Sequence, residues 1–452
     1  MKIVIAGAGI GGMVAAEKLG KLGFEVTVYE QSPSLDEMRY DWHDDVNPKV
    51  FRRLGMEMPA ESNKKKSWTF ISPFGAVIRE FRQDENNADY SVERRPLNRM
   101  LYNRACDVAK FVFGANVTAP IVRGNRVAGI VVNGEEVEAD LVVDSLGVDS
   151  VLRKGLPHSM GITQYRPDEV FVAYRAFYEK NPDAPEPKYT NKVYLKHMGA
   201  PGISWAIQDH DPTLVNVLVG RIGALDEKTL AEALDDLRKH NPTIGDKVVR
   251  GGEICKIPVR YPATRMVANG YAAVGDSAYL TIPMLGSGIA TSMLAGAMLA
   301  QSIGENMSHG VKGAELFKVG KLWRYQVRIF RDFGAEHCAV DVMKRSVLTM
   351  KNEVLDWLLG SDLLTNEEMG KLASGKIIKI GFGEAVRKIK VAGVNKLGRL
   401  ISINNMLQKS YFAASGAKNI PRNYTDSITK TWEAHMMRFY KLTAKQKKAL
   451  GH

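Results

Sequence analysis

The chain has 452 residues, enough for two or three domains of ordinary size with a large buried core. Hydrophobic residues make up 45% of it and charged residues 25%, a composition that excludes disorder for the bulk of the chain. Its three cysteines are far apart, which excludes a disulfide scaffold, a four-cysteine zinc site and a cysteine-ligated iron–sulfur cluster. We therefore expect no metal site and a reducing, cytoplasmic compartment.

The net charge of +12 is concentrated near the C-terminus. Residues 371–452 hold 17 Lys or Arg and three acidic residues, a local charge of +14 that leaves −2 for residues 1–370. Nucleic acid and anionic lipid both offer a negative surface to such a segment. No DNA- or RNA-binding motif accompanies it, so we expect no nucleic-acid partner but peripheral attachment to an anionic membrane surface. Apolar residues between the charges favour an interfacial helix: Ile401, Met406, Leu407, Tyr411 and Phe412.

The first predicted element in chain order is a βαβ unit. A β-branched strand at 3–6 leads into a glycine-rich turn, an apolar helix follows as far as Leu22, and a second strand at 25–29 ends at Glu30. Such a unit binds a dinucleotide. Gly7 allows the tight turn, Gly9 lets the backbone approach a pyrophosphate and Gly12 permits close packing of helix and strand. Glu30 is placed to accept hydrogen bonds from a ribose, of either FAD or NAD.

The later segments predict a strand-rich middle and a helical end. Short strands are expected over 117–144 with a hairpin turn at 133–134, further strands over 170–220, a helix over 225–239 and a strand over 271–275 that runs into Asp276. Long helices take over from about residue 312. The uncharged stretch 277–304 is long enough to span a membrane, but Pro283 and several glycines argue against a span.

Three segments together resemble the p-hydroxybenzoate-hydroxylase-like flavoprotein superfamily: the N-terminal glycines, residues 139–153, and Gly275-Asp276 followed by the segment 283–289. The spacing of the last motif is similar to that of the geranylgeranyl reductase branch, and weaker matches at 333–345 and 420–422 extend the resemblance over nearly the whole chain. It implies an α/β fold: a discontinuous Rossmann-like FAD-binding domain (1–165 with 250–310), an inserted antiparallel-sheet substrate domain (166–249) and a basic helical C-terminal domain (311–452).

FAD is the cofactor that this resemblance implies. Asp276, at the end of a strand, can accept hydrogen bonds from the ribityl chain, and the backbone amides of 286–289 can serve the N1–C2=O edge of the flavin. The resemblance also assigns a cofactor contact to Arg94 and an adenine contact to the backbone of Val117. The full set of expected FAD-binding residues is Gly7, Ala8, Gly9, Ile10, Gly11, Gly12, Glu30, Gln31, Arg94, Val117, Gly275, Asp276, Pro283, Gly286, Ser287, Gly288 and Ile289.

Three departures from the family pattern concern the catalytic residues. Leu146-Gly147 stands where flavin hydroxylases carry Asp-Gly, and Trp42-His43 stands where the reductase branch carries Cys-Gly. Of the branch's aromatic substrate motif, 203–208 retains only Trp205. We take His43, Trp42 and Trp205 as the catalytic candidates: His43 as a proton donor or a partner of its acidic neighbours, and Trp205 as a substrate wall or a core residue.

The resemblance predicts an FAD-dependent oxidoreductase that reduces C=C bonds of an apolar substrate, such as the prenyl chain of a lipid or quinone. Its electron donor would be NAD(P)H or a small redox carrier, because no second dinucleotide fingerprint is visible. Two alternatives stay open on sequence: a flavin monooxygenase of an aromatic or polyketide-like compound, and an electron-transfer flavoprotein that donates to quinone.

Overall fold

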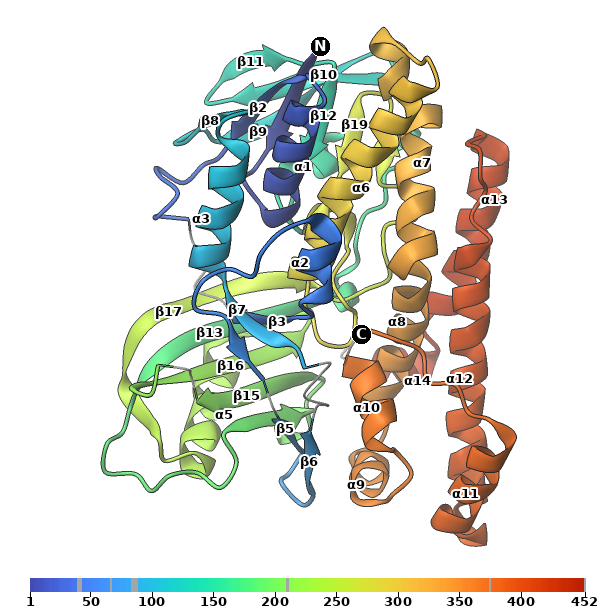
Figure 1. Ribbon diagram of the computed structural model, residues 1–452. Helices are drawn as coiled ribbons and strands as arrows, with labels where there is room; N and C mark the ends of the chain where they lie inside the picture. The colour runs from blue at the N-terminus through green and yellow to red at the C-terminus, as the bar shows by residue number, and fades with distance from the viewer. Residues whose placement is uncertain (39–42, 66, 83–87, 209–210, 374, 451–452) are drawn as a thin grey trace.

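The computed structural model describes residues 1–38, 43–65, 67–82, 88–208, 211–373 and 375–450. At one end of the molecule lies a six-stranded sheet with the strand order β18-β19-β12-β1-β2-β8 (Figure 1). Its members are β18 (Val267–Ala268), β19 (Tyr271–Ala273), β12 (Leu141–Asp144), β1 (Lys2–Ala6), β2 (Glu25–Tyr29) and β8 (Lys110–Val112). All neighbours run parallel except β18 and β19. The predicted βαβ unit is therefore completed by strands from three distant parts of the chain.

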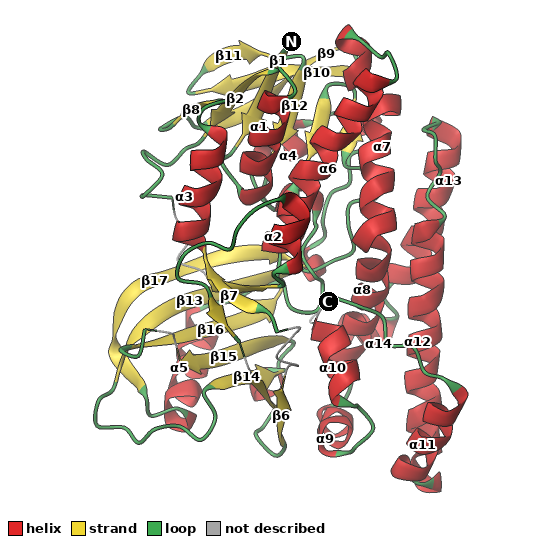
Figure 2. Cartoon of the chain, in the orientation of Figure 1, coloured by secondary structure: helices red, strands yellow, loops and turns green. Residues whose placement is uncertain are grey.

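Two helices beside this sheet cross each other at very close range. They are α1 (Ile10–Lys21) and α6 (Ile289–Ser308), beside which α3 (Arg94–Ala105) lies further out (Figure 2). A Cβ atom at Gly296 of α6 would come within 2.3 Å of the Gly11 carbonyl oxygen and 2.9 Å of the Ala15 nitrogen. Glycine at 296 is therefore required by the crossing of α1 and α6, which brings the N-termini of both helices to one side of the sheet.

A second, seven-stranded sheet lies below the first in Figure 1, with the order β17-β13-β16-β15-β14-β5-β6. Its strands are β5 (Ser67–Ile71), β6 (Ile78–Arg82), β13 (Val170–Lys180), β14 (Asn191–Leu195), β15 (Gly202–Gln208), β16 (Leu214–Ile222) and β17 (Ile244–Pro258), and α5 (Glu227–His240) covers it. The sheet extends beyond the predicted interval 166–249. Residues 67–82 supply the last two strands at one end of the sheet, and residues 250–258 continue β17 because they stay paired with β13.

Smaller elements join the two large sheets. The predicted hairpin turn is present, with positive φ at Asn133 and Gly134 between β10 (Arg126–Val132) and β11 (Glu135–Glu138), next to β9 (Val117–Arg123). A further small sheet holds β3 (His43–Val46), β7 (Tyr90–Glu93) and β4 (Asn63–Lys64). The remaining short helices are α2 (Lys49–Leu54), α4 (Val151–Gly155), and the turns η1 (His158–Met160), η2 (Pro167–Glu169), η3 (His197–Gly199), η4 (Gly275–Ala278) and η5 (Gly313–Phe317).

Helices form the C-terminal part, as predicted. The bounds are α7 (Val319–Ile329), the π-helical turn η6 (Phe330–Gly334), α8 (Ala335–Leu348), α9 (Asn352–Gly360), α10 (Asn366–Ala373), α11 (Phe382–Ala392), η7 (Val394–Lys396), α12 (Leu397–Lys418), α13 (Asp426–Met437), η8 (Arg438–Tyr440) and α14 (Ala444–Ala449). In Figure 1, α12 runs alongside α8 and carries α11 at its lower end. None of the helices in the described ranges is both long and apolar enough to cross a membrane.

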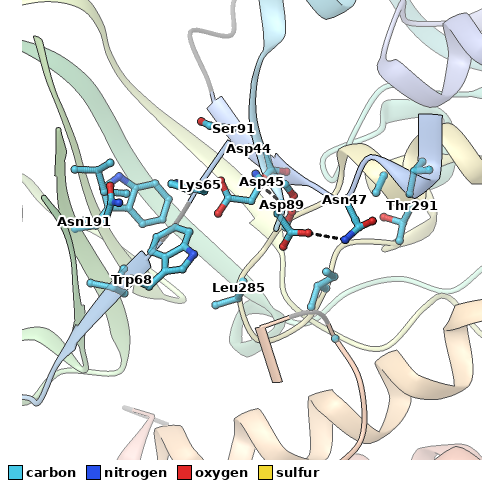
Figure 3. Close-up of a pocket in the computed structure, with 18 of the residues that line it drawn as sticks. Asp44, Asp45, Asn47, Lys65, Trp68, Asp89, Ser91, Asn191, Leu285 and Thr291 are labelled. Atoms are coloured by element: carbon cyan, nitrogen blue, oxygen red, sulfur yellow. Dashed lines mark hydrogen bonds and ion pairs between the residues drawn. The ribbon is translucent and has the colours of Figure 1, made fainter. Parts of the chain in front are cut away.

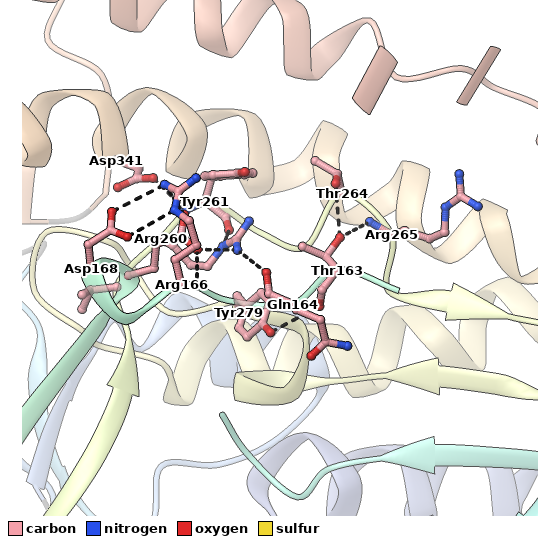
Figure 4. A network of polar contacts seen from close by, with 12 residues as sticks. Thr163, Gln164, Arg166, Asp168, Arg260, Tyr261, Thr264, Arg265, Tyr279 and Asp341 are labelled. Carbon is pink, nitrogen blue, oxygen red and sulfur yellow. Dashed lines mark hydrogen bonds and ion pairs between the residues drawn. The ribbon is translucent and has the colours of Figure 1, made fainter. Parts of the chain in front are cut away.

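A buried network of charges ties α8 to the start of the seven-stranded sheet (Figure 4). The Arg345 guanidinium on α8 lies 3.1 Å from Asp341, 3.2 Å from Asp168 and 3.1 Å from Glu169. Arg260, between β17 and β18, lies 2.7 Å from the other oxygen of Glu169. Because all of these side chains are buried, each charge depends on its partners for compensation. The network holds the helical part in one position against both sheets.

Candidate active site

Two cavities meet between the sheets and the helices. One is a cleft of about 470 Å³ along the carboxyl ends of β1, β2 and β12. The other, of about 850 Å³, lies between the seven-stranded sheet, α6 and the π-helical turn (Figure 3). The residues that line both are Asp44, Arg175, Trp205, Leu285 and Ser287. A molecule in the cleft and another in the larger cavity would therefore face each other across this shared wall.

The glycine fingerprint forms one end of the cleft. The N-terminus of α1 has no side-chain cap, so its backbone amides open into the cleft. Gly7 has a φ of +85°, and a Cβ at Gly12 would lie 2.8 Å from both the Gly7 carbonyl oxygen and Ser145 Oγ. The predicted roles of Gly7 in the turn and of Gly12 in close packing thus match the geometry. Ser145, which follows β12 and accepts a hydrogen bond from the Gly12 amide, was not predicted.

Glu30 stands at the end of β2, as the sequence predicts. Its two carboxylate oxygens each accept a hydrogen bond from a backbone amide, from Ala8 and from Ser32, at 2.9 Å. The carboxylate therefore stiffens the glycine turn as well as lining the cleft. Each oxygen retains a lone pair, so the group can still accept from ribose hydroxyls.

The other end of the cleft is formed by the loop before α6. Ile282 donates to the Ser287 carbonyl oxygen at 2.8 Å and Gly286 donates to the Ile282 carbonyl oxygen at 2.8 Å, which folds the loop into a compact turn. Asp44 from β3 holds it from outside: Ser287 Oγ donates to Oδ1 at 2.8 Å and the Gly288 amide donates to Oδ2 at 3.2 Å. Asp44 is thus the residue that fixes the start of α6 against β3.

Two carboxyl groups in this region have raised pKa values. Burial raises the pKa of Asp276 to about 6, although Arg94 opposes the shift, and Asp44 adds to it. Burial and the neighbouring Asp45 carboxylate raise the pKa of Asp44, against its bonds to Ser287 and Gly288 and the charge of Arg175. Both groups therefore lie where a negative charge is costly, beside the junction of the two cavities.

The structure brings most of the predicted FAD-binding residues together. All of them line the cleft except Ala8, Gly12 and Pro283. Ala8 and Gly12 nevertheless contribute backbone amides to Glu30 and Ser145. Among the catalytic candidates, Trp205 lies on the shared wall. Trp42 falls outside the described residues, and of His43 only the backbone is described, at the start of β3.

Sequence reasoning missed a polar group on the seven-stranded sheet. Arg175 in β13 is buried, and its Nε donates a hydrogen bond to Asn216 Oδ1 at 3.1 Å. The same oxygen also accepts a hydrogen bond from Trp205 Nε1 at 3.1 Å. The Arg175 guanidinium lies 5.3 Å from the centre of the Trp205 ring. A single arginine within the apolar strand 170–178 is a signal that the sequence does carry, since an unexplained buried charge favours a functional role.

A substrate space between the strand-rich part and the C-terminal helices is expected from the sequence, but the contribution of β4, Lys65 and β5 to its wall is not. Lys65 Nζ lies 2.9 Å from Asp45 Oδ1 and 3.9 Å from the centre of the Trp68 ring (Figure 3). Aliphatic and aromatic side chains also line the cavity: Phe70, Val193, Ile203, Ile207, Ile282, Leu294 and Phe333. The cavity therefore offers apolar surface beside polar and charged groups.

The residues of the cleft fit FAD. Two helix N-termini open toward it, those of α1 and α6, and neither has a side-chain cap of its own. A Cβ at Gly288 would lie 2.9 Å from Thr281 and 3.3 Å from Asp276, so only glycine keeps that approach open. Carboxylates stand at the two positions where the ribose and the ribityl hydroxyls are expected, Glu30 and Asp276.

Comparisons with known proteins agree with this geometry. The family model of an NAD(P)-binding Rossmann-like domain matches residues 5–39. The chain is 21% identical over 435 residues to the digeranylgeranylglycerophospholipid reductase of Sulfolobus acidocaldarius, covering 93% of both chains. It is 26% identical over 364 residues to the protein of the same name from Haloferax volcanii, covering 72% of this chain and 82% of the relative.

A solved structure has the same fold. The geranylgeranyl bacteriochlorophyll reductase-like protein of Thermoplasma acidophilum superposes with a TM-score of 0.70 at 20% identity, covering 86% of this chain and 98% of that chain. Together, the relatives and the shared fold confirm the resemblance drawn from the motifs, which is to the geranylgeranyl reductase branch of the p-hydroxybenzoate-hydroxylase-like FAD-dependent oxidoreductases.

Proposed function

We propose that this protein is an FAD-dependent reductase that saturates C=C bonds in the prenyl chains of a lipid or quinone. The observation that carries the proposal is the wall shared by the FAD cleft and the 850 Å³ cavity, because it places an apolar substrate directly beside the cofactor. The names of the relatives, digeranylgeranylglycerophospholipid reductases, support this substrate class. A monooxygenase or a quinone-reducing electron carrier has less support.

When bound and reduced, FAD supplies the hydride. The chain's own groups bind and orient the substrate. Trp205 and Leu285 form an apolar edge at the junction, while Asn216 holds Trp205 and Arg175 in fixed positions. Asp44 keeps the loop at 286–288 in place. Exclusion of water by the aromatic wall favours transfer to carbon over loss to solvent.

Trp42 and His43 remain proposals for the same junction. His43 begins β3, whose next residue, Asp44, lies on the shared wall. A proton donor at this point would supply the proton that completes alkene reduction. Trp42 would limit the width of the substrate that reaches the cofactor.

The test is single-turnover reduction of a prenyl lipid. The enzyme is photoreduced without oxygen and mixed with a C20 prenyl alcohol, and flavin reoxidation is followed while the product is analysed for added hydrogen. We expect reoxidation with saturation of a double bond. Reoxidation only by oxygen, with a hydroxylated product, would favour the monooxygenase, and reoxidation by quinone without saturation would favour the electron carrier.

A pair of variants ties the reaction to the cavity. Ile203→Trp on β15 should fill part of the space and abolish reoxidation by the alkene while leaving FAD bound. Ile254→Trp on β17, where the native side chain is 50% exposed, serves as the matched control and should react as the wild type does. Equal activity in both variants would refute the placement of the substrate.

We also propose that the basic C-terminal segment binds an anionic membrane peripherally. Of the apolar residues expected to face the lipid, Ile401 and Phe412 are exposed, whereas Leu407 is buried and Met406 and Tyr411 pack with it against Val340 and Met343 of α8. Further exposed apolar side chains lie near Ile401, on α11 and at the start of α12: Val386, Ile389, Val391 and Leu397. Lys390, Lys396 and Arg399 lie among them.

The electron donor, NAD(P)H or a small redox carrier, is a proposal without a site in the described residues.

A further inference from the structure

His337 is a buried polar side chain on the wall of the larger cavity. It is 3% exposed and lines that cavity together with its helix neighbours Phe333 and Glu336. Its Nδ1 atom has no hydrogen-bond partner among the described residues. Buried polar atoms in folded proteins are almost always paired, so an unpaired one beside a cavity points to a ligand that pairs with it. None of the residues assigned above to FAD or to the shared wall uses this group.

A π-helical turn directly precedes the helix that carries His337. The π-helical turn Phe330–Gly334 separates α7 from α8, and α8 begins at Ala335. An extra residue in one turn shifts the phase of everything that follows, and such turns are frequent at functional sites. The result here is that Phe333 and His337 both reach the cavity, with their ring centres 5.1 Å apart.

Apolar groups lie close to the His337 ring, although Glu336 and Lys376 line the same cavity. Its Cδ2 lies close to Gly375, next to Ile282 of the loop that leads to α6. Burial alone lowers the pKa of His337 to about 3, so the imidazole is neutral at physiological pH and offers one donor and one acceptor. A neutral, buried imidazole suits an uncharged oxygen of a ligand better than a carboxylate or a phosphate.

A pure hydrocarbon chain cannot pair with this nitrogen. The prenyl chain proposed above fills the apolar part of the cavity, but the molecule that carries it has an oxygen at the end of the chain. We propose that His337 is a specificity-determining residue that hydrogen-bonds a neutral oxygen of the substrate, a hydroxyl, ether, ester or quinone carbonyl, and so sets which double bond reaches the flavin. This inference rests on the proposed function for the identity of the chain.

The experiment measures binding to the oxidised holoenzyme, without turnover. The two probes are a C20 prenyl alcohol and the matched hydrocarbon that lacks the hydroxyl, and binding is followed by the change in the flavin spectrum. His337→Leu removes the hydrogen bond, and His337→Asn keeps an amide near the position of Nδ1. His309→Leu, at an exposed histidine after α6, is the control.

The quantity of interest is the Kd of the hydrocarbon divided by that of the alcohol. We expect this ratio to fall by about tenfold in His337→Leu, to be largely kept in His337→Asn and to be unchanged in His309→Leu. Comparing the ratio between variants cancels the different water solubilities of the probes. In turnover, His337→Leu should also redistribute the double bonds that are reduced, whereas a merely structural role would lower all of them alike.

Two outcomes would overturn the inference. One is a wild-type ratio in His337→Leu, whether both probes keep their affinity or lose it equally, and the other is a ratio in His337→Asn as low as in His337→Leu. Failure of the proposed function leaves a different trace: both probes would fail to bind to the wild type, or would bind without ever reoxidising the reduced flavin.

Discussion

Asp276 and Asp44 lie close enough for the charge of Asp44 to raise the pKa of Asp276. A different kind of partner stabilises each of the two carboxylates. Asp44 accepts hydrogen bonds from Ser287 and the Gly288 amide, whereas Asp276 is stabilised by the positive charge of Arg94. Burial dominates at both, and it raises both pKa values. In the absence of FAD, ionisation of Asp276 therefore destabilises the folded protein. The predicted role of Asp276, accepting hydrogen bonds from the cofactor, nevertheless favours the ionised carboxylate.

We predict a pH-dependent stability that depends on Asp276. The pKa of Asp276 rises from 3.8 to about 6 on folding, so the folded flavin-free protein binds more protons than the unfolded chain between these pH values. Its stability should therefore fall as the pH rises from about 4 to about 6. In Asp276→Asn the part of this loss that Asp276 causes should be absent and only that of Asp44 should remain, leaving the variant more stable at pH 7 by at most about 3 kcal/mol.

Urea unfolding of the flavin-free wild type and variant across this pH range measures the difference. Asp246→Asn, at an exposed aspartate on β17, is the control and should follow the wild type. Parallel pH profiles for the wild type and Asp276→Asn would show that Asp276 keeps an ordinary pKa.

At the scale of residues, the sequence predicted the cofactor site better than the substrate site. Gly7, Gly12, Glu30 and Asp276 follow from local spacing, because strand, turn and helix are contiguous in the chain. Arg175 and His337 could not be found in this way. They come from segments more than 150 residues apart, and only the packing of sheet against helix turns both toward one cavity.

Among the elements, the place of β5 and β6 in the sheet could not be predicted from local sequence either. Their residues do alternate in burial, but they join the sheet only by pairing β5 in parallel with β14, more than 120 residues further along. No local pattern specifies that partner. The helices from 319 onward were predicted, since their periodicity is local. The burial of Leu407 on α12 was not predicted, because it results from contact with α8.

The exposed ends of α11 and α12 lead to a second prediction. The apolar side chains there are surrounded by lysines and arginines, and each such cation near an anionic surface contributes on the order of 1 kcal/mol. The triple substitution Val386→Ser, Ile389→Ser and Ile401→Ser should reduce co-sedimentation with anionic vesicles severalfold. Binding to neutral vesicles should be weak for all forms, and salt should release the wild type.

Ile428→Ser provides the control, because Ile428 is 57% exposed on α13, and Figure 1 places α13 at the opposite end of the helical layer from α11. It should pellet as the wild type does. If the triple variant and the control pellet equally, or if neutral and anionic vesicles capture the protein alike, the membrane surface lies elsewhere.

For the molecule as a whole, the buried network around Arg345 connects the C-terminal helices to the seven-stranded sheet. Three carboxylates converge on this guanidinium: Asp341 from α8 itself, and Asp168 and Glu169 from the entry to β13. Arg345→Met should destabilise the protein by about 3 kcal/mol, because three buried carboxylates lose a shared cation and keep only their bonds to Lys344, Arg260 and Arg166. Thermal unfolding of the holoenzyme measures the loss.

The exposed ion pair between Lys430 and Asp426, at 2.6 Å, allows a matched comparison. Lys430→Met removes the same charge from the surface and should change stability by less than about 1 kcal/mol. Similar losses in the two variants would mean that water reaches the Arg345 network.

The strand order of the six-stranded sheet also governs when the protein can fold during its synthesis. β1 leaves the ribosome first, yet its partner β12 ends at residue 144 and the next strand, β19, ends at residue 273. At 5–20 residues per second, the nascent chain waits roughly 15–55 s for the last parallel strand to appear. Until β12 emerges, β1 has one sheet edge uncovered, and from then until β19 emerges the uncovered edge is that of the apolar strand β12. Growing chains of this protein are therefore natural clients for chaperones that shield exposed strands, and FAD can join only after α6 has emerged.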